Sequence, residues 1–153
     1  FYVNDSNFFH SFFSLNNIDY LICAEDIYGG QTVIDLTNRI MKSHSTNEDG
    51  FIWTDFYLSP NGKKLATVGC YWACPYVIKL FDFSEPMNLP LNEIKESDLL
   101  DNDEIIVGWL DNETLQMKGF KRDREPEYFD GGSFRMKIIN ETKVERQIKI
   151  NGT

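Results

Sequence analysis

The chain has 153 residues, of which 42% are hydrophobic and 14% aromatic, and its formal net charge at pH 7 is −9. This apolar content excludes a disordered chain, because it provides enough surface to offset the entropy lost on folding, and the length fits one domain with a real core. The acidic charge argues against nucleic acid and membrane surfaces as partners, since both are predominantly anionic.

The N-terminal part predicts two strands that follow an aromatic segment. Residues 8–13 are mostly aromatic and fit either a short strand or a helical turn. Residues 20–24 predict a strand, residues 28–31 a glycine turn, and residues 32–36, which are rich in β-branched side chains, the returning strand. Residues 43–50 are polar and predict a loop.

The middle of the chain carries the strongest local signal. Two β-prone runs, residues 51–58 and 64–70, flank Ser-Pro-Asn-Gly at positions 59–62. Proline presets φ, asparagine tolerates left-handed geometry, and glycine accepts a positive φ, so this tetrapeptide predicts a tight turn between two strands. Residues 75–83 alternate in polarity and predict a third strand.

Residues 84–90 contain two prolines and are expected to be irregular. Leucine and isoleucine at loosely helical intervals predict one short helix over residues 91–100. Residues 104–110 predict a strand, with a turn at 111–113 leading into another strand at 114–118.

The C-terminal part predicts a charged loop and a last hairpin. The loop covers residues 121–132, and strands at 133–139 and 143–150 are joined by a turn at 140–142. Strand signals recur at short intervals throughout, which is typical of antiparallel meandering sheets. We therefore predict a single all-β domain over residues 1–153, with one short helix at most.

The segment Leu58–Ala66 resembles the inner hairpin of a β-propeller blade. The same hairpin rhythm occurs in three stretches, residues 20–36, 51–83 and 105–118, so the resemblance covers about residues 18–118. The resemblance implies sheets built like propeller blades. The Trp-Asp dipeptide of WD-like repeats is absent, with Phe81-Asp82-Phe83 in a comparable place, and a closed propeller needs at least about four blades. We therefore expect no closed propeller.

Cys70 and Cys74 are the residues with the most evident chemical potential. A zinc site needs about four ligands at paired spacings, and a thioredoxin-type pair is Cys-x-x-Cys at a helix start, so neither pattern fits. We predict that the two thiols bracket a turn, bind no metal and do no redox work, and that the protein uses no cofactor. His44 leaves an alternative open, a hydrolase or thiol enzyme in which His44 activates Cys70 or Cys74.

The number of cysteines bears on the compartment. Three cysteines do not suggest a disulfide framework in a chain of this length, and predict a reducing, cytoplasmic setting. Four Asn-x-Ser/Thr sequons, beginning at Asn4, are interpreted as chance matches in an Asn-rich chain. The first residues lack the basic start and long apolar core of a signal peptide. The sequence does not begin with Met, which leaves open that residues precede Phe1.

The aromatic side chains divide into two groups. The three tryptophans, Trp53, Trp72 and Trp109, lie in or beside predicted strands and are expected in the core. The positions of four other rings are left open: Phe12, Phe13, Tyr57 and Phe129. Several of these rings exposed together would indicate a protein interface.

An acidic run follows the predicted helix start, and comprises Glu93, Glu96, Asp98, Asp101, Asp103 and Glu104. It lacks the glycine of an EF-hand loop, so it is interpreted as a solvated face. A small basic segment is expected to pair with it: Lys118, Lys121, Arg122 and Arg124.

The function predicted from the sequence is that of a non-enzymatic, acidic protein-interaction module. An inhibitor or immunity-type protein fits this description, and so does a structural component of an assembly. A basic protein is the partner that the charge favours. The residues predicted to contact it are Glu96, Asp98, Asp101 and Asp103.

Overall fold

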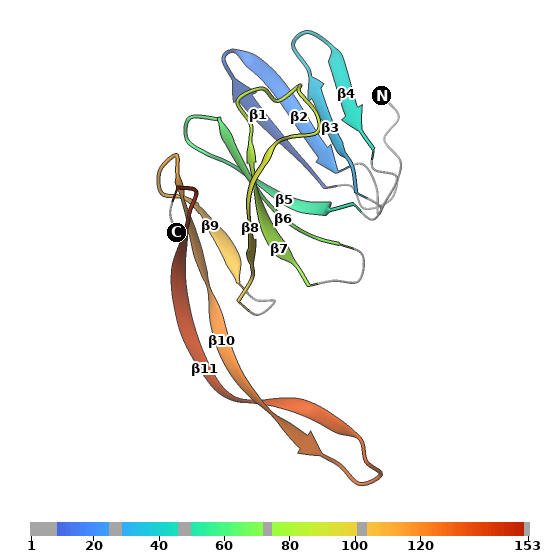
Figure 1. Ribbon diagram of the computed structural model, residues 1–153, viewed down its shortest axis with the longest axis vertical. Helices are drawn as coiled ribbons and strands as arrows, with labels where there is room; N and C mark the ends of the chain where they lie inside the picture. The colour runs from blue at the N-terminus through green and yellow to red at the C-terminus, as the bar shows by residue number, and fades with distance from the viewer. Residues whose placement is uncertain (1–8, 25–28, 46–49, 72–74, 101–103, 152–153) are drawn as a thin grey trace.

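The computed structural model of the protein describes residues 9–24, 29–45, 50–71, 75–100 and 104–151. These residues form eleven strands and no helix, and the all-β prediction is confirmed. The strands lie in three antiparallel sheets, and each strand pairs only with its neighbours in the sequence. The chain thus builds one meandering sheet after another (Figure 1).

The first sheet contains β1 (His10–Leu15), β2 (Ile18–Ala24), β3 (Gln31–Asp35) and β4 (Ile40–His44). The second sheet contains β5 (Ile52–Leu58), β6 (Lys64–Cys70), β7 (Val77–Asp82) and β8 (Glu93–Asp98). The third sheet contains β9 (Ile105–Trp109), β10 (Thr114–Tyr128) and β11 (Phe134–Lys149). The predicted strands at residues 20–24, 32–36, 51–58, 64–70, 75–83 and 104–110 are confirmed as β2, β3, β5, β6, β7 and β9.

The turn between β5 and β6 has the structure that its residues predict. The Gly62 amide donates to the Ser59 carbonyl oxygen at 2.8 Å, and the Ser59 amide donates to the Lys64 carbonyl oxygen at 2.9 Å. Gly62 has a φ of 72°, which favours glycine, and a Cβ at this position would lie 2.5 Å from Cδ1 of Leu15 in β1. The turn is therefore fixed by its own backbone and by the first sheet packed against it.

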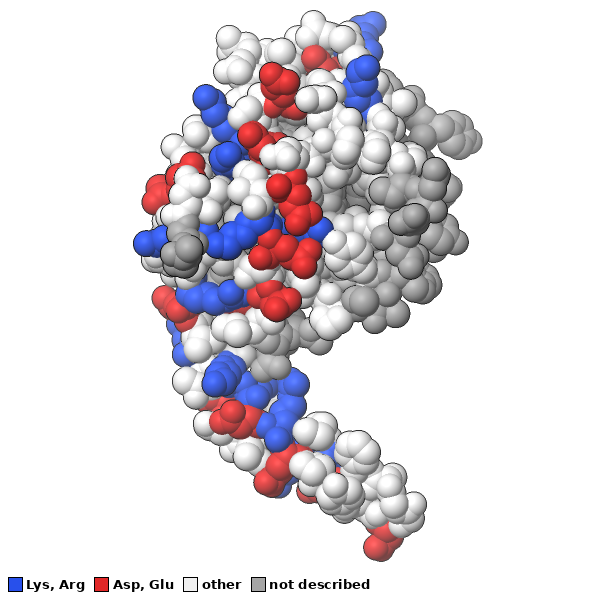
Figure 2. Space-filling model, viewed as in Figure 1, with Lys and Arg blue, Asp and Glu red and all other residues white. Residues whose placement is uncertain are grey.

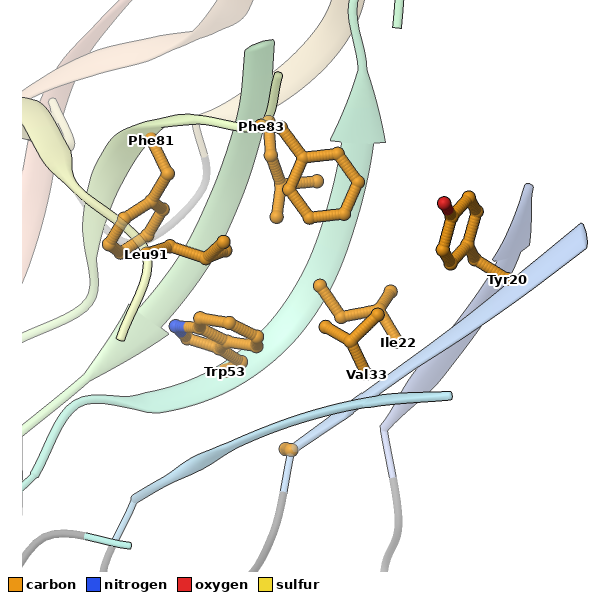
Figure 3. Close-up of a cluster of buried hydrophobic side chains, with 9 residues drawn as sticks. Tyr20, Ile22, Val33, Trp53, Phe81, Phe83 and Leu91 are labelled. Carbon is orange, nitrogen blue, oxygen red and sulfur yellow. The ribbon is translucent and has the colours of Figure 1, made fainter. Parts of the chain in front are cut away.

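The second sheet lies between the other two and buries both of its faces. Successive side chains of a strand point to opposite faces, so Leu65 and Phe81 meet the first sheet while Ala66 and Leu80 meet the third. The core against the first sheet consists of Tyr20, Ile22, Ala24, Val33, Trp53, Leu65, Phe81, Phe83 and Leu91 (Figure 3). The core against the third sheet consists of Ala66, Ile78, Leu80, Ile106, Leu115, Met117 and Ile148.

The short helix predicted over residues 91–100 is wrong, because this segment forms strand β8. Its register along β7 runs from Phe81 opposite Glu93 to Val77 opposite Asp98. β7 is apolar and buried along nearly its whole length, and its outer edge needs a partner for its backbone hydrogen bonds. Strand pairing satisfies that edge and overrides a loose helical spacing.

The predicted loop at residues 43–50 begins too early, because β4 reaches His44. The Ser43 hydroxyl lies 2.8 Å from the Thr32 hydroxyl on the neighbouring strand, so the polar residue is part of the ladder. Most of β4 is exposed, and it therefore lacks the apolar alternation that marks a strand in the sequence. Residues 46–49 lie outside the described residues.

The loop predicted at residues 121–132 and the turn predicted at 140–142 are also wrong, whereas the strands predicted at 133–139 and 143–150 both lie in β11. Residues 121–128 continue strand β10, and residues 140–142 lie inside the single long strand β11. The hairpin turns at residues 129–133, where the Phe129 amide donates to the Ser133 carbonyl oxygen at 2.9 Å. Charged residues form this ladder because they pair across it: Arg122 with Glu141, and Arg135 with Glu127.

The hairpin of β10 and β11 extends well beyond the other two sheets (Figure 1). Its root is held by Arg146 of β11, whose guanidinium donates to both carboxylate oxygens of Glu104 at 2.7 and 2.8 Å. The same guanidinium donates to the Ser97 hydroxyl at 3.2 Å and to the Asp98 carbonyl oxygen of β8. The Glu104 side chain is only 1% exposed, so this contact joins the third sheet to the second through a buried carboxylate.

We predict that Arg146→Met destabilises the fold by about 3 kcal/mol, because it removes the cation from a buried carboxylate. The measurement is the free energy of unfolding in urea. The control is Arg135→Met, which breaks the ion pair with Glu127 from a side chain that is 67% exposed, and should cost less than about 1 kcal/mol. Equal losses in the two variants would contradict this account of the hairpin root.

Candidate functional site

The outer part of the hairpin, residues 120–143, is termed the arm. β9 pairs with β10 only from Leu115 to Lys118. Beyond that point β10 pairs only with β11, so within the described residues the arm is a two-stranded ribbon. The side chains of the arm can pack against the opposite strand, but they belong to neither of the two cores.

The outer half of the arm has one apolar face and one charged face. The cross-strand pairs Tyr128–Phe134 and Pro126–Met136 alternate with Glu127–Arg135 and Glu125–Lys137. Because alternate residues of a strand share a face, the first two pairs lie together on one side, with Ile138 and its cross-strand partner Arg124 at the inner end. The exposed fractions on that side are 73% for Tyr128, 61% for Phe134, 52% for Met136 and 46% for Ile138. This is a contiguous apolar surface of the kind that marks an interaction site.

The apolar residues lie on one side of the ribbon at the root of the hairpin and on the other side in its outer half. At the root, Leu115 and Met117 of β10 face the second sheet. In the outer half, the apolar residues of β10 are Pro126 and Tyr128, which have the opposite parity. A bulge at Ile139 shifts β11 by one residue, so that both strands present apolar side chains on the same new side. The outer half therefore carries its apolar side chains on the other side of the ribbon from those at the root.

Both edges of the arm are protected against the addition of another strand. Pro126 has no N–H to donate along the β10 edge, and the bulge at Ile139 interrupts the β11 edge. Prolines, bulges and charges are the usual protection of free edges. The arm is therefore suited to contacts through its apolar face and not through its edges.

Two of the aromatic residues that the sequence left open are exposed. Phe129 lies at the end of the arm, with the Arg135 guanidinium 5.2 Å from its ring centroid, and Phe12 projects from the edge strand β1. Phe13 and Tyr57 pack against the two cores instead.

The tryptophan prediction can be assessed at two of its three positions. Trp53 is fully buried. Trp109 packs against the second core and donates its indole N–H to the Tyr57 carbonyl oxygen at 2.9 Å. Trp72 lies outside the described residues.

The solvated-face interpretation of the acidic run is wrong for Glu104, which is buried, whereas Glu93 and Glu96 are exposed and also pair with a lysine. Glu93 and Glu96 bind Lys79 at 2.6 and 3.1 Å, and Glu104 is buried against Arg146. Figure 2 shows acidic and basic side chains interleaved on the visible face, not a separate acidic patch.

Two of the predicted contact residues, Glu96 and Asp98, lie on β8, while Asp101 and Asp103 lie outside the described residues. The basic segment was predicted to pair with the acidic run, but the structure gives Arg122 an ion pair with Glu141. Arg146 and Lys79, which the sequence analysis did not single out, bind the acidic run.

A cavity of about 220 Å³ lies between the first two sheets. Its polar lining includes Gln31, His44, Tyr71, Lys79 and Glu93. His44 thus shares a cavity with Tyr71, the residue after Cys70. The alternative of a thiol enzyme stays a prediction.

Lys79 is the cation of this cavity, and its side chain is almost fully buried. Its ammonium lies 5.1 Å from the ring centroids of both Phe51 and Tyr71. Burial by itself would lower the pKa of Lys79, but hydrogen bonds to Glu93, Tyr71 and Glu96 outweigh burial and hold that pKa above its ordinary value. Lys79 therefore stays protonated and cannot act as a base or nucleophile near neutral pH.

The described cysteines are Cys23 and Cys70, and Cys23 is a free thiol. Cys23 is buried in β2, and burial raises the pKa of its thiol to about 11. Cys70 ends β6 and is half-buried, and Cys74 lies outside the described residues. Among the described residues, no group of three or more His, Cys, Asp or Glu side chains could hold a metal ion, and no helix is long and apolar enough to cross a membrane.

No protein-family model matches the chain. Over 85 residues the chain is 34% identical to an uncharacterised protein of Acanthamoeba polyphaga mimivirus. This match covers 54% of the chain and 34% of the viral protein, so the chain spans about a third of that relative. Among solved structures, it is similar to the acylaminoacyl peptidase of Pyrococcus horikoshii with 18% identity and a TM-score of 0.48, over 91% of this chain and 26% of the peptidase. A similarity this low supports no inference about activity.

We predict that Cys23 does not react with iodoacetamide in the folded protein at pH 7.5, because its thiol is buried and almost entirely protonated. Cys70, which is more exposed, should react first. Mass spectrometry of peptides after timed alkylation measures both rates, and the same reaction in urea is the control. Alkylation of Cys23 at the rate of an unfolded thiol would contradict the prediction.

Proposed function

We propose that this domain is a non-enzymatic protein-interaction module that binds its partner through the apolar face of the arm. The observation that carries the proposal is the amphipathic outer half of the hairpin. The polar groups of its charged face are satisfied by water and by the ion pair of Arg135 with Glu127, at 2.6 Å. Its apolar face has four large exposed side chains from Tyr128 to Ile138, and exposed clusters with aromatic and methionine side chains are typical of interfaces.

We also propose that the three sheets are blade-like units that serve as the support for the arm. Two features support this: each of the first two sheets is a four-stranded meander, and the second packs through both faces. We propose with it the reducing, cytoplasmic setting that the cysteine count predicts, which the free, buried thiol of Cys23 supports.

The negative charge remains a proposed aid to association with a basic partner. Exposed charges increase the rate of encounter more than they increase affinity. Glu96, Asp98, Asp101 and Asp103 remain the residues proposed for this role. Glu96 also binds Lys79 at 3.1 Å, so its contribution to stability has to be measured separately.

We predict that Tyr128→Ser combined with Phe134→Ser abolishes capture of the partner from an extract of the source cell. These side chains are 73% and 61% exposed, so the variant should fold with an unchanged urea midpoint. The control is Glu125→Ser with Lys137→Ser, a cross-strand pair on the opposite face of the same ribbon. Quantitative mass spectrometry of the captured proteins gives the result. Equal capture by both variants would show that the arm is not the contact surface.

For the acidic residues, we predict that Asp98→Asn, Asp101→Asn and Asp103→Asn together slow association with the captured partner at low salt and have little effect at high salt. Stopped-flow or surface-binding kinetics at two salt concentrations provide the measurement. Adding Glu96→Gln should slow association further, with a stability change that urea unfolding detects. A wild-type association rate that does not depend on salt would refute the steering role.

A further inference from the structure

We propose that the surface bound by the arm is the arm of a second copy of this chain, packed face to face and antiparallel in a two-fold symmetric dimer. This inference rests on the proposed function, because it names the partner of the same apolar face. It commits to one occupant, and three properties of the arm support it: the area of the face, the protection of the edges, and the distribution of charge.

The exposed apolar area is sufficient for a specific dimer. Tyr128, Phe134, Met136 and Ile138 are between 46% and 73% exposed. Since a large aromatic side chain offers about 150–250 Å² when fully exposed, these residues present on the order of 500 Å² per copy. Two faces together would bury about 1,000 Å², which is the size at which specific interfaces begin.

The contact that the arm offers is sheet on sheet. Pro126 and the bulge at Ile139 oppose strand addition at the two edges, whereas Tyr128, Phe134 and Met136 lie exposed together on one face. Two antiparallel ribbons can stack through such faces about 10 Å apart, as the layers of a β-sandwich do. In that arrangement the charged faces, with Arg135 and Glu127 paired, stay on the outside.

The charge distribution favours an antiparallel arrangement. Residues 120–143 contain six Lys or Arg and five Asp or Glu, so the arm carries a formal charge of +1 and the remaining residues carry −10. Two parallel arms would bring two strongly acidic bodies together. Antiparallel arms keep the bodies at opposite ends, where salt screens their repulsion.

The ends of the arm are complementary to each other. With the two-fold axis at Pro126, counting along β10 places Tyr128 opposite Arg124 of the second copy. Asp130 lies in the turn, two residues beyond the end of β10, and comes level with Arg122 of the second copy. An arginine over a tyrosine ring is a favourable cation–π contact, and Asp130 meets a basic side chain. The same surface therefore supplies both halves of an isologous contact.

The first test is the molar mass of the purified protein over a wide concentration range, by sedimentation velocity. The wild type should show a reversible monomer–dimer equilibrium. Met136→Glu, which places two carboxylates near the axis, should weaken dimerisation at least tenfold. The matched control is Lys137→Gln, the next residue, which changes the charge by the same amount on the opposite face, and it should leave the dimer intact.

The second test addresses orientation. Asp130→Lys and Arg122→Glu, each alone, should weaken the dimer about fivefold, because each places like charges opposite each other. The two changes combined should restore most of the affinity. Arg122→Glu also removes the ion pair with Glu141, so the urea midpoint is measured for each variant. Lack of recovery in the double variant would overturn the antiparallel arrangement.

A wild type that stays monomeric at every concentration overturns the second-copy inference. If Tyr128→Ser with Phe134→Ser then still abolishes capture of a different protein, the proposed function stands without this inference. If that variant captures normally, both fail. Binding of the monomeric wild type to phosphatidylcholine vesicles, lost in Met136→Glu, would overturn the inference in favour of a lipid surface.

Discussion

The structure depends on a central sheet that must bury both of its faces. In β7, Val77, Ile78, Lys79, Leu80 and Phe81 are all buried, and alternate members of this run point to opposite sides. A sheet of this kind cannot be stable with one face in water, because its exposed apolar surface would cost about 25 cal/mol per Å². The first sheet covers one face and the third covers the other, and this requirement fixes the order of the three layers.

The same requirement explains the two contacts that place the hairpin. The third sheet covers Leu80 with Leu115 and Met117, so the root of β10 has to lie against the second sheet. Arg146 then binds the buried carboxylate of Glu104 and the end of β8. Once the root is fixed in this way, the rest of the hairpin continues outward, beyond the other two sheets (Figure 1).

The sequence predicts the parts of the fold in which local chemistry decides. Ser59 to Gly62 specifies the β5–β6 turn, and the flanking alternation specifies both strands. The sequence does not predict β8, because its strand conformation comes from the edge of β7 and not from its own residues. It also does not predict the long ribbon, because Arg122 and Glu141 satisfy each other across strands, and such pairing is invisible in a one-dimensional charge run.

From the sequence, only the kind of candidate site is predicted, namely a surface that contacts another protein. The sequence pointed to an acidic surface at Glu96 and Asp98, and Glu96 turned out to bind Lys79. The period-two signal of the arm is present in Phe134, Met136 and Ile138, which alternate with basic residues. The bulge at Ile139 ends that alternation after a few residues, so the face becomes visible only when the cross-strand register is known.

The ribbon character of the arm has a consequence for its dynamics. A two-stranded hairpin without a core is marginally stable in water by itself, whereas the root shares a core with the second sheet. The arm should therefore open by local fluctuations that cost much less free energy than global unfolding, and its amide protons should exchange with solvent long before those of β6 and β7. Any surface that covers the arm would slow this exchange, so that the folding of the ribbon and its occupancy become a single coupled equilibrium.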